Sequence, residues 1–196
     1  RRCHGSLQAL SGDGQVKDRG AYLHGIRQGA WSFSQVKGQT KEEGPFHAGQ
    51  RQGEWTFYDR GRLVSRGEYA AGLRQGHWRY YDAQGKEISS GQYNEDKRTG
   101  PWRTQDSQSR PCRGLMKDGL KTGLWTCWRD EAESQRWAEG SYVAGKEEGL
   151  WQTWYPSGPL KRAGEYRAGE REGQWLDYGE TLYRQGQIVY TRRNRP

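Results

Sequence analysis

The chain is poor in aliphatic side chains. Leu, Ile, Val and Phe together supply 23 of its 196 residues, and all hydrophobic residues 31%, against about 45–50% in ordinary soluble domains. A compact globule with a thick aliphatic core is therefore disfavoured. The sequence also has no run of 18 apolar residues, so no transmembrane helix is predicted.

Aromatic residues and glycine are abundant instead, with 10 Trp, 12 Tyr and 29 Gly. Aromatic rings bury a large area each, so a chain can fold on Trp and Tyr if its architecture spaces the rings regularly. The net charge is +8, from 32 basic and 24 acidic residues. This balance favours acidic protein surfaces, anionic lipid head groups or nucleic acid as partners, without choosing between them.

A repeat organises most of the sequence. A Gly-x-aromatic triplet recurs along the chain, with Gly114-Leu115-Met116 as a variant, and nine residues after its glycine comes Gly-x-Trp. Seven of the ten tryptophans obey this rule, at spacings of 23 to 26 residues, and we expect them to be structural. They are Trp31, Trp55, Trp78, Trp102, Trp125, Trp151 and Trp175.

Each repeat predicts two β-strands. The third repeat, residues 67–81, is followed by the turn signal of residues 82–85, and similar Gly or Asp turns separate the other repeats. The expected fold is all-β: an elongated, single-layer, twisted antiparallel sheet of stacked hairpins. We divide the chain into an N-terminal half-repeat or cap (1–19), seven repeats (20–178), and a C-terminal cap strand with a basic tail (179–196).

The hairpin register follows from the turn. A two-residue turn at residues 72–73 places glycine first, as a type II′ turn prefers. It pairs Gly67 with Trp78. It likewise pairs Tyr69 with Gly76. Each ring would then cover the bare backbone of a glycine on the facing strand.

The pattern resembles the MORN repeat, in the bacterial variant that carries Gly-x-Trp and Gly-x-Tyr, over most of the chain from about Gly20 to Tyr178. The resemblance implies stacked antiparallel hairpins in one long sheet. The chain departs from the pattern where Gln105 stands for an aromatic residue, Met116 for Tyr, and Glu147 for the turn Arg or Lys. Asp96 replaces a turn glycine, and Asp tolerates positive φ better than most residues.

Two of the three cysteines face each other in this register. The pairing that joins Gly114 to Trp125 also joins Cys112 to Cys127, close enough for a disulfide. That bond would indicate an oxidising compartment such as a bacterial periplasm. The alternative is two reduced cysteines in aromatic positions. Cys3 is left over, near a start at Arg1 that suits a processed N-terminus, and we consider it as a lipidation site.

Two columns of side chains are candidates for partner binding. The first is a basic row at the hairpin turns, expected along one long edge of the sheet, and its alternative is a solvated turn residue copied with the repeat. The second is an aromatic column three residues after the tryptophans, on the opposite face if no bulge intervenes. The two columns are Arg27, Arg51, Arg74, Arg98, Lys121 and Arg171, and Tyr58, Tyr81, Trp128, Trp154 and Tyr178.

Two irregular stretches interrupt the later repeats. Residues 104–111 are polar and lack aromatics, and residues 129–136, followed by Trp137, lengthen the fifth repeat. Insertions into a repeat array are often loops at its binding face. The alternative is tolerated drift in surface turns.

Catalysis has no support in the sequence. It contains no G-x-S-x-G, H-E-x-x-H, phosphate-loop or C-x-x-C motif. His4, His24, His47 and His77 occupy different positions of the repeat, so they do not converge in one column. We therefore predict no enzyme, no cofactor and no metal site.

The resemblance also implies a function. The chain is similar to MORN-variant antitoxins and to periplasmic immunity proteins paired with phospholipase toxins of type VI secretion. We thus expect a periplasmic protein that neutralises a secreted toxin by direct binding, with a partner that is acidic at the contact. The alternative is a structural scaffold or membrane-surface module that holds anionic lipid head groups. Nucleic acid is not an expected partner, although aromatics with interleaved Arg suit single strands.

Overall fold

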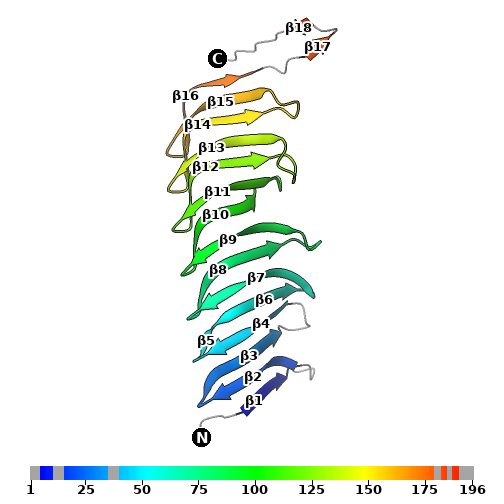
Figure 1. Ribbon diagram of the computed structural model, residues 1–196, viewed down its shortest axis with the longest axis vertical. Coiled ribbons are helices and arrows are strands. Elements are labelled where there is room, and N and C mark those ends of the chain that lie inside the picture. Colours follow the sequence, from blue (N-terminus) through cyan, green and yellow to red (C-terminus); the bar gives the residue numbers. More distant parts are fainter. Residues whose placement is uncertain (1–4, 11–15, 35–39, 179–181, 185–186, 190–196) are drawn as a thin grey trace. The chain divides into compact units, whose positions relative to one another are not determined.

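The computed structural model describes residues 5–10, 16–34, 40–178, 182–184 and 187–189. Their regular secondary structure is entirely β (Figure 1). Sixteen strands form one open antiparallel sheet in which neighbours in sequence are neighbours in space, and β17 and β18 form a separate pair. The predicted all-β fold of stacked hairpins is confirmed. Cys3, the expected turn at residues 11–14 and the basic tail at residues 192–195 lie outside the described residues.

The chain divides into two compact units, Arg1–Arg98 and Thr99–Pro196. We call them the N-terminal and C-terminal units. The strands of the N-terminal unit are β1 (Gly5–Leu10), β2 (Val16–Leu23), β3 (Ile26–Ser34), β4 (Thr40–His47), β5 (Gln50–Arg51), β6 (Gly53–Asp59), β7 (Arg62–Ala70), β8 (Leu73–Tyr81) and β9 (Glu87–Asn94).

Strand β10 (Lys97–Gln105) carries the chain from the first unit into the second. The remaining strands of the C-terminal unit are β11 (Pro111–Lys117), β12 (Leu120–Trp128), β13 (Arg136–Val143), β14 (Lys146–Trp154), β15 (Leu160–Arg167), β16 (Glu170–Asp177), β17 (Leu182–Arg184) and β18 (Gln187–Val189).

The hairpin turn lies one residue earlier than the sequence predicts. Ala70 pairs with Leu73, so Ala71 and Gly72 are the two central residues. Their φ angles are 49° and 82°, and positive φ at both positions is what a type I′ turn requires, not the expected type II′. Asp96, at the position of Gly72 in the next hairpin, has a φ of 65°, so its expected tolerance of positive φ is confirmed.

Two extra residues in β8 then restore the predicted contact between glycine and tryptophan. The register shifts between Arg66 and Glu68, where the facing strand is two residues longer. Gly67 therefore meets Trp78 as predicted, but the predicted pair of Tyr69 and Gly76 does not form. Tyr69 pairs with Arg74 in its own hairpin, and on its other side with Gly53 of the preceding one. The irregularity therefore restores the predicted partner of Trp78. It does not restore that of Tyr69, which lies between the irregularity and the turn.

The tryptophans lie against glycine throughout the sheet. A Cβ atom added to Gly67 would lie 2.3 Å from Cδ2 of Trp78, and five other hairpins show the same approach. The indole N–H of Trp78 donates to the carbonyl of Glu68 at 3.0 Å. Trp31, Trp55, Trp78, Trp102 and Trp125 are each at most 3% exposed, while Trp151 and Trp175 are half-buried.

The core is an aromatic stack on one face of the sheet, which we call the front face. In the N-terminal unit Trp31, Phe46 and Trp55 form its buried centre, with partly buried aromatic residues around them. Trp55 and Tyr69 meet edge to face at 6.0 Å between ring centroids, and Tyr69 meets Trp78 in the same way at 5.2 Å. Such contacts stabilise beyond the area they bury, which compensates for the shortage of aliphatic residues.

A single-residue bulge marks the start of several strands, at the end away from the two-residue turns. In the N-terminal unit the extra residue is Val64 in β7 and Ile88 in β9. In the C-terminal unit it is Trp137 in β13 and Lys161 in β15. The bulge is a repeated feature of the fold, and the residue in it changes from aliphatic to aromatic or basic.

Candidate functional site

The basic row folds over the front face. The repeat alone predicts charges along an edge, but the structure places each cation against the aromatic stack. Arg51 lies 4.2 Å from the Trp55 ring centroid, and Lys121 lies 4.4 Å from that of Trp125. The same kind of contact, or a hydrogen bond to a tyrosine hydroxyl, holds the others: Arg27 with Trp31, Arg74 with Tyr93, Arg98 with Tyr93, and Arg171 with Trp175.

Carboxylates neutralise part of this row. Arg51 pairs with Glu42 at 2.7 Å, and Arg74 pairs with Asp96 at 2.7 Å. The hydrogen bond from Arg74 holds the pKa of the Asp96 carboxyl below its usual range. Burial lowers the pKa of Lys121. These side chains therefore have partners within the sheet, and the row is not an open line of solvated charge.

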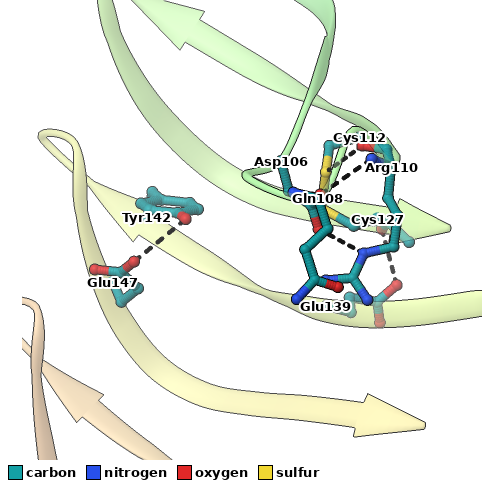
Figure 2. Close-up of a disulfide and its surroundings, with 9 residues drawn as sticks. Asp106, Gln108, Arg110, Cys112, Cys127, Glu139, Tyr142 and Glu147 are labelled. Atoms are coloured by element: carbon teal, nitrogen blue, oxygen red, sulfur yellow. Dashed lines mark hydrogen bonds and ion pairs between the residues drawn. A yellow bond between two sulfur atoms is a disulfide. The ribbon is translucent and has the colours of Figure 1, made fainter. Parts of the chain in front are cut away.

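The cysteines form the predicted disulfide. Cys112 pairs directly with Cys127 across β11 and β12, their Cα atoms are 4.0 Å apart, and their sulfurs are bonded (Figure 2). The bond occupies the front face, where other hairpins carry aromatic residues. The alternative of two reduced cysteines is wrong for this structure, and the bond is compatible with an oxidising compartment.

The second aromatic column lies on the other face, which we call the reverse face. In β6 the side chains alternate, so Tyr58 points away from the stack that Phe57 joins. The bulges that accompany this column are in the following strand, so they leave the alternation of the column's own strands intact. Tyr58, Tyr81, Trp128 and Trp154 are half-buried, and Tyr178 is exposed. Arg136 lies 4.8 Å from the Trp154 ring.

Sequence reasoning missed a set of leucines on the reverse face of the C-terminal unit. Each is adjacent in its strand to a front-face residue, and each is 40–57% exposed. Leu150 and Leu176 line one shallow cavity together with Glu165 and Glu172. The set is Leu115, Leu124, Leu150 and Leu176. Leu124 and Leu150 have a signal in the sequence, because each stands between Gly and Trp, where the N-terminal unit has Ala30, Glu54 or His77.

The longer irregular stretch contacts the two strands that flank the shorter one. Arg103 in β10 pairs with Glu131 of the longer stretch, and Arg113 in β11 pairs with Glu133 at 2.7 Å. In the shorter stretch, Asp106 accepts hydrogen bonds from the backbone N–H groups of residues 108 and 110. The shorter stretch is thus an ordered turn between β10 and β11, and ion pairs hold the longer one against both strands.

Two other kinds of site are absent from the described residues. These residues hold no group of three or more His, Cys, Asp and Glu side chains that could bind a metal ion, and no helix long and apolar enough to cross a membrane. A cavity of about 260 Å³ opens beside Phe33, Phe57, Tyr58 and Val64 in the N-terminal unit.

Comparison with known proteins adds little to this picture. No family model and no curated protein matches the chain. A solved structure, "Crystal structure of GtfA/B complex bound to UDP and GlcNAc", aligns at 16% identity with a TM-score of 0.23. The alignment covers 57% of this chain and 22% of that one. A likeness this weak carries no argument about function.

Proposed function

We propose that this protein is a binding protein of the immunity or antitoxin type, which neutralises a secreted protein toxin by covering part of its surface. It acts through contact and performs no catalysis. The binding surface is the reverse face of the C-terminal unit, with the leucines and the later members of the second aromatic column. The single observation that carries this proposal is the exposure of Leu115, Leu124, Leu150 and Leu176 on one face.

Exposed leucines on one face call for an explanation. Single exposed apolar residues are common on protein surfaces, but a group on one face is typical of interfaces. Leu124 and Leu150 are 57% and 55% exposed, and Trp128 and Trp154 lie further along the same strands and on the same face. Leucine and tryptophan side chains of this kind supply the apolar centre of a protein interface.

The sheet is also suited to binding without rearrangement. The hairpins are joined to their neighbours along their length, and the disulfide ties β11 to β12. A rigid surface loses little conformational entropy when it binds. The disulfide fits residence in the periplasm, where a cell would meet a secreted toxin.

A lipid-binding scaffold has less support. That function requires basic side chains free to contact phosphate head groups. Arg51 and Arg74 each contact an aromatic ring and a carboxylate instead, and Glu147 interrupts the row. The observed contacts therefore favour a protein partner over an anionic membrane.

The proposal is tested by capture and neutralisation. The disulfide-bonded protein is used as bait in extracts and culture fluid of its native cells, and captured proteins are identified by mass spectrometry. We expect a secreted effector, whose toxicity is suppressed when the two proteins are produced together. Replacing Leu124 and Leu150 by Glu should weaken capture at least tenfold, because charge would be buried in the apolar contact.

His77→Glu is the matched control, because His77 occupies the position of Leu124 in another repeat and is exposed. It should leave capture and neutralisation unchanged. Binding to anionic vesicles with no effector captured, or equal capture by the leucine variant, would show that the proposal is wrong.

A further inference from the structure

The bulges of the C-terminal unit bring two unusual residues together. Trp137 and Lys161 are the extra residues of β13 and β15, and the Lys161 Nζ atom lies 6.0 Å from the Trp137 ring centroid. In the N-terminal unit the same position holds aliphatic Val64, which lines a cavity beside Phe57. Because an aliphatic residue is sufficient at this position in the N-terminal unit, folding alone does not explain the ammonium group of Lys161.

Two arginines from the irregular stretches complete a cluster around this indole. The guanidinium carbon of Arg110 lies 3.9 Å from the Trp137 ring centroid, and that of Arg129 lies 4.7 Å from it. Lys161 also lies 5.6 Å from the ring of Tyr155. We call Arg110, Arg129, Trp137 and Lys161 the Trp137 cluster. All four residues belong to the C-terminal unit.

The cluster has more positive than negative charge. Asp106 pairs with Arg110 at 2.8 Å, and Figure 2 shows the Arg110 side chain folded back on this carboxylate beside the disulfide. No ion pair to Arg129 or Lys161 is found within the described part of the chain. One carboxylate therefore faces three cations.

The nearby acidic loop does not correct this imbalance. Glu131 and Glu133 pair with Arg103 and Arg113, and Asp130 accepts hydrogen bonds from Ser134 within its own loop. Each of these three carboxylates has a partner outside the Trp137 cluster. An anion from another molecule would thus meet cations that the fold itself leaves under-compensated.

Arg129 is the member best placed to receive an anion. One of its terminal nitrogens donates to the backbone carbonyl of Trp154 at 2.5 Å. Its Nε atom is buried and has no hydrogen-bond partner among the described residues. Burial, together with the charge of Arg110, lowers the pKa of Arg129. A buried donor without a partner costs free energy. A carboxylate beside the guanidinium group would relieve its repulsion with Arg110, and it would satisfy Nε once the Arg129 side chain moves to expose that atom.

The disulfide holds the two arginines in place. Arg110 is two residues before Cys112, and Arg129 is two residues after Cys127. Because the two cysteines pair directly across β11 and β12, their covalent bond keeps the ends that carry both guanidinium groups side by side against the repulsion between them. The two guanidinium groups are therefore held close together before a ligand arrives.

We propose that the Trp137 cluster is a carboxylate-binding site that receives an Asp or Glu side chain of the partner protein. This inference rests on the proposed function and gives the partner's chemistry at a second point of contact, beside the front-face disulfide and apart from the leucines of the reverse face. Guanidinium groups match the fork of a carboxylate, and the indole holds them in place through cation–π contact. The net charge of +8 led us to expect a partner that is acidic at the contact, and we place that contact at the Trp137 cluster.

The first experiment uses the disulfide-bonded protein and a model ligand. An acetylated, amidated tetraglutamate peptide is titrated into ¹⁵N-labelled protein, with the tetraglutamine peptide as the neutral comparison. We expect saturable shifts of the Arg129 Nε–H and Trp137 indole N–H signals with tetraglutamate alone. Arg129→Gln and Lys161→Gln should each weaken peptide affinity at least fivefold, whereas Arg60→Gln, an exposed turn arginine in the N-terminal unit, should not change it.

Several outcomes would overturn the site. They are shifts that do not saturate, equal shifts with tetraglutamine, unchanged affinity in both variants, and tighter binding of inorganic phosphate than of tetraglutamate. The two variants are made separately, so that the test can still be done if one of them fails to fold. Arg129→Lys, which keeps the charge and loses the fork, should recover only part of the affinity.

The second experiment separates this site from the proposed function. The double variant Arg129→Gln/Lys161→Gln is tested against the captured toxin, and we expect its affinity to fall at least tenfold. If the toxin binds this variant as tightly as the parent while Leu124→Glu/Leu150→Glu loses it, the site is wrong and the proposed function stands. If tetraglutamate binds at the cluster but no toxin is ever captured, the site stands and the proposed function is wrong.

Discussion

The indole of Trp78 lies so close to Gly67 that a Cβ atom there would be 2.3 Å from the ring. The approach is made across the irregularity in β7 and β8, where the indole N–H also donates to the carbonyl of Glu68. The ring thus fills the space above a bare backbone and satisfies one of its polar groups. Repeated along the sheet, this relationship substitutes for a second layer.

Replacing Gly67 with Ala should destabilise the protein severely. The φ angle of Gly67 is not positive, so alanine is tolerated by the backbone and the cost comes from collision with the Trp78 ring. We expect a loss of about 3 kcal/mol, at the upper end for overpacking, measured by urea denaturation. Gly85→Ala, which has open space but a φ of 81°, should cost only about 1 kcal/mol.

A double-mutant cycle isolates the contact between Gly67 and Trp78. In a Trp78→Ala background the Gly67→Ala change should cost well under 1 kcal/mol, because the ring that it meets is gone. An equal cost in both backgrounds would mean that the ring is not what requires glycine there.

Removing the disulfide should weaken the fold without abolishing it. The cysteines are 15 residues apart, and a loop of that length predicts a loss of about 3 kcal/mol. For a chain of this size that is a fall in Tm of roughly 6–12 °C, measured by calorimetry on Cys112→Ser/Cys127→Ser. Cys3→Ser is the control and should leave Tm unchanged; three reactive thiols in the native parent protein would contradict the bond.

Arg51 should contribute to stability more than to binding. Its guanidinium group contacts the Trp55 ring and pairs with Glu42, and both interactions are partly exposed. Arg51→Gln should cost about 1–2 kcal/mol and leave capture of the partner intact. Arg60→Gln, in an exposed turn, should change stability by less than about 0.5 kcal/mol. If Arg51→Gln lost capture of the partner without losing stability, Arg51 would instead belong to the binding interface.

Asp96 should make stability depend on acid pH. The hydrogen bond from Arg74 lowers the pKa of Asp96 below its usual value of 3.8. A depressed folded-state pKa gives stability above the unfolded value that is lost as pH falls through the folded one. Asp96→Asn, which keeps a side chain suited to positive φ, should therefore be less stable than the parent at pH 7, by under about 1 kcal/mol because the pair is exposed.

This difference should shrink below pH 3.8 and vanish once Asp96 is protonated in the folded state. Urea denaturation from pH 7 to pH 2 follows the change. Asp118→Asn, the same substitution in another hairpin turn, is the control. A difference that stays constant with pH would exclude the Arg74 interaction as its cause.

Local spacing was sufficient to predict the strands, the Gly67–Trp78 contact and the disulfide. The type of turn was not predictable in the same way. Ala71 and Gly72 form a type I′ turn, and only the irregularity further along the hairpin compensates for it. Sequence periodicity gives the spacing of residues along one strand, and it does not reveal where one strand has more residues than the strand that it faces. The predicted Tyr69–Gly76 pair failed for this reason.

The amino-acid sequence by itself determined that this chain forms stacked hairpins, because glycine and ring recur at intervals that suit a pleated strand. Tertiary structure decided which charges are already neutralised and which are not. The side chain of Arg51 folds back onto a ring and a carboxylate, whereas Arg129 and Lys161 lie beside Trp137 and form no ion pair with another described residue. That outcome depends on bulges and on a loop that closes over neighbouring strands, and such contacts between distant residues leave no period in a sequence.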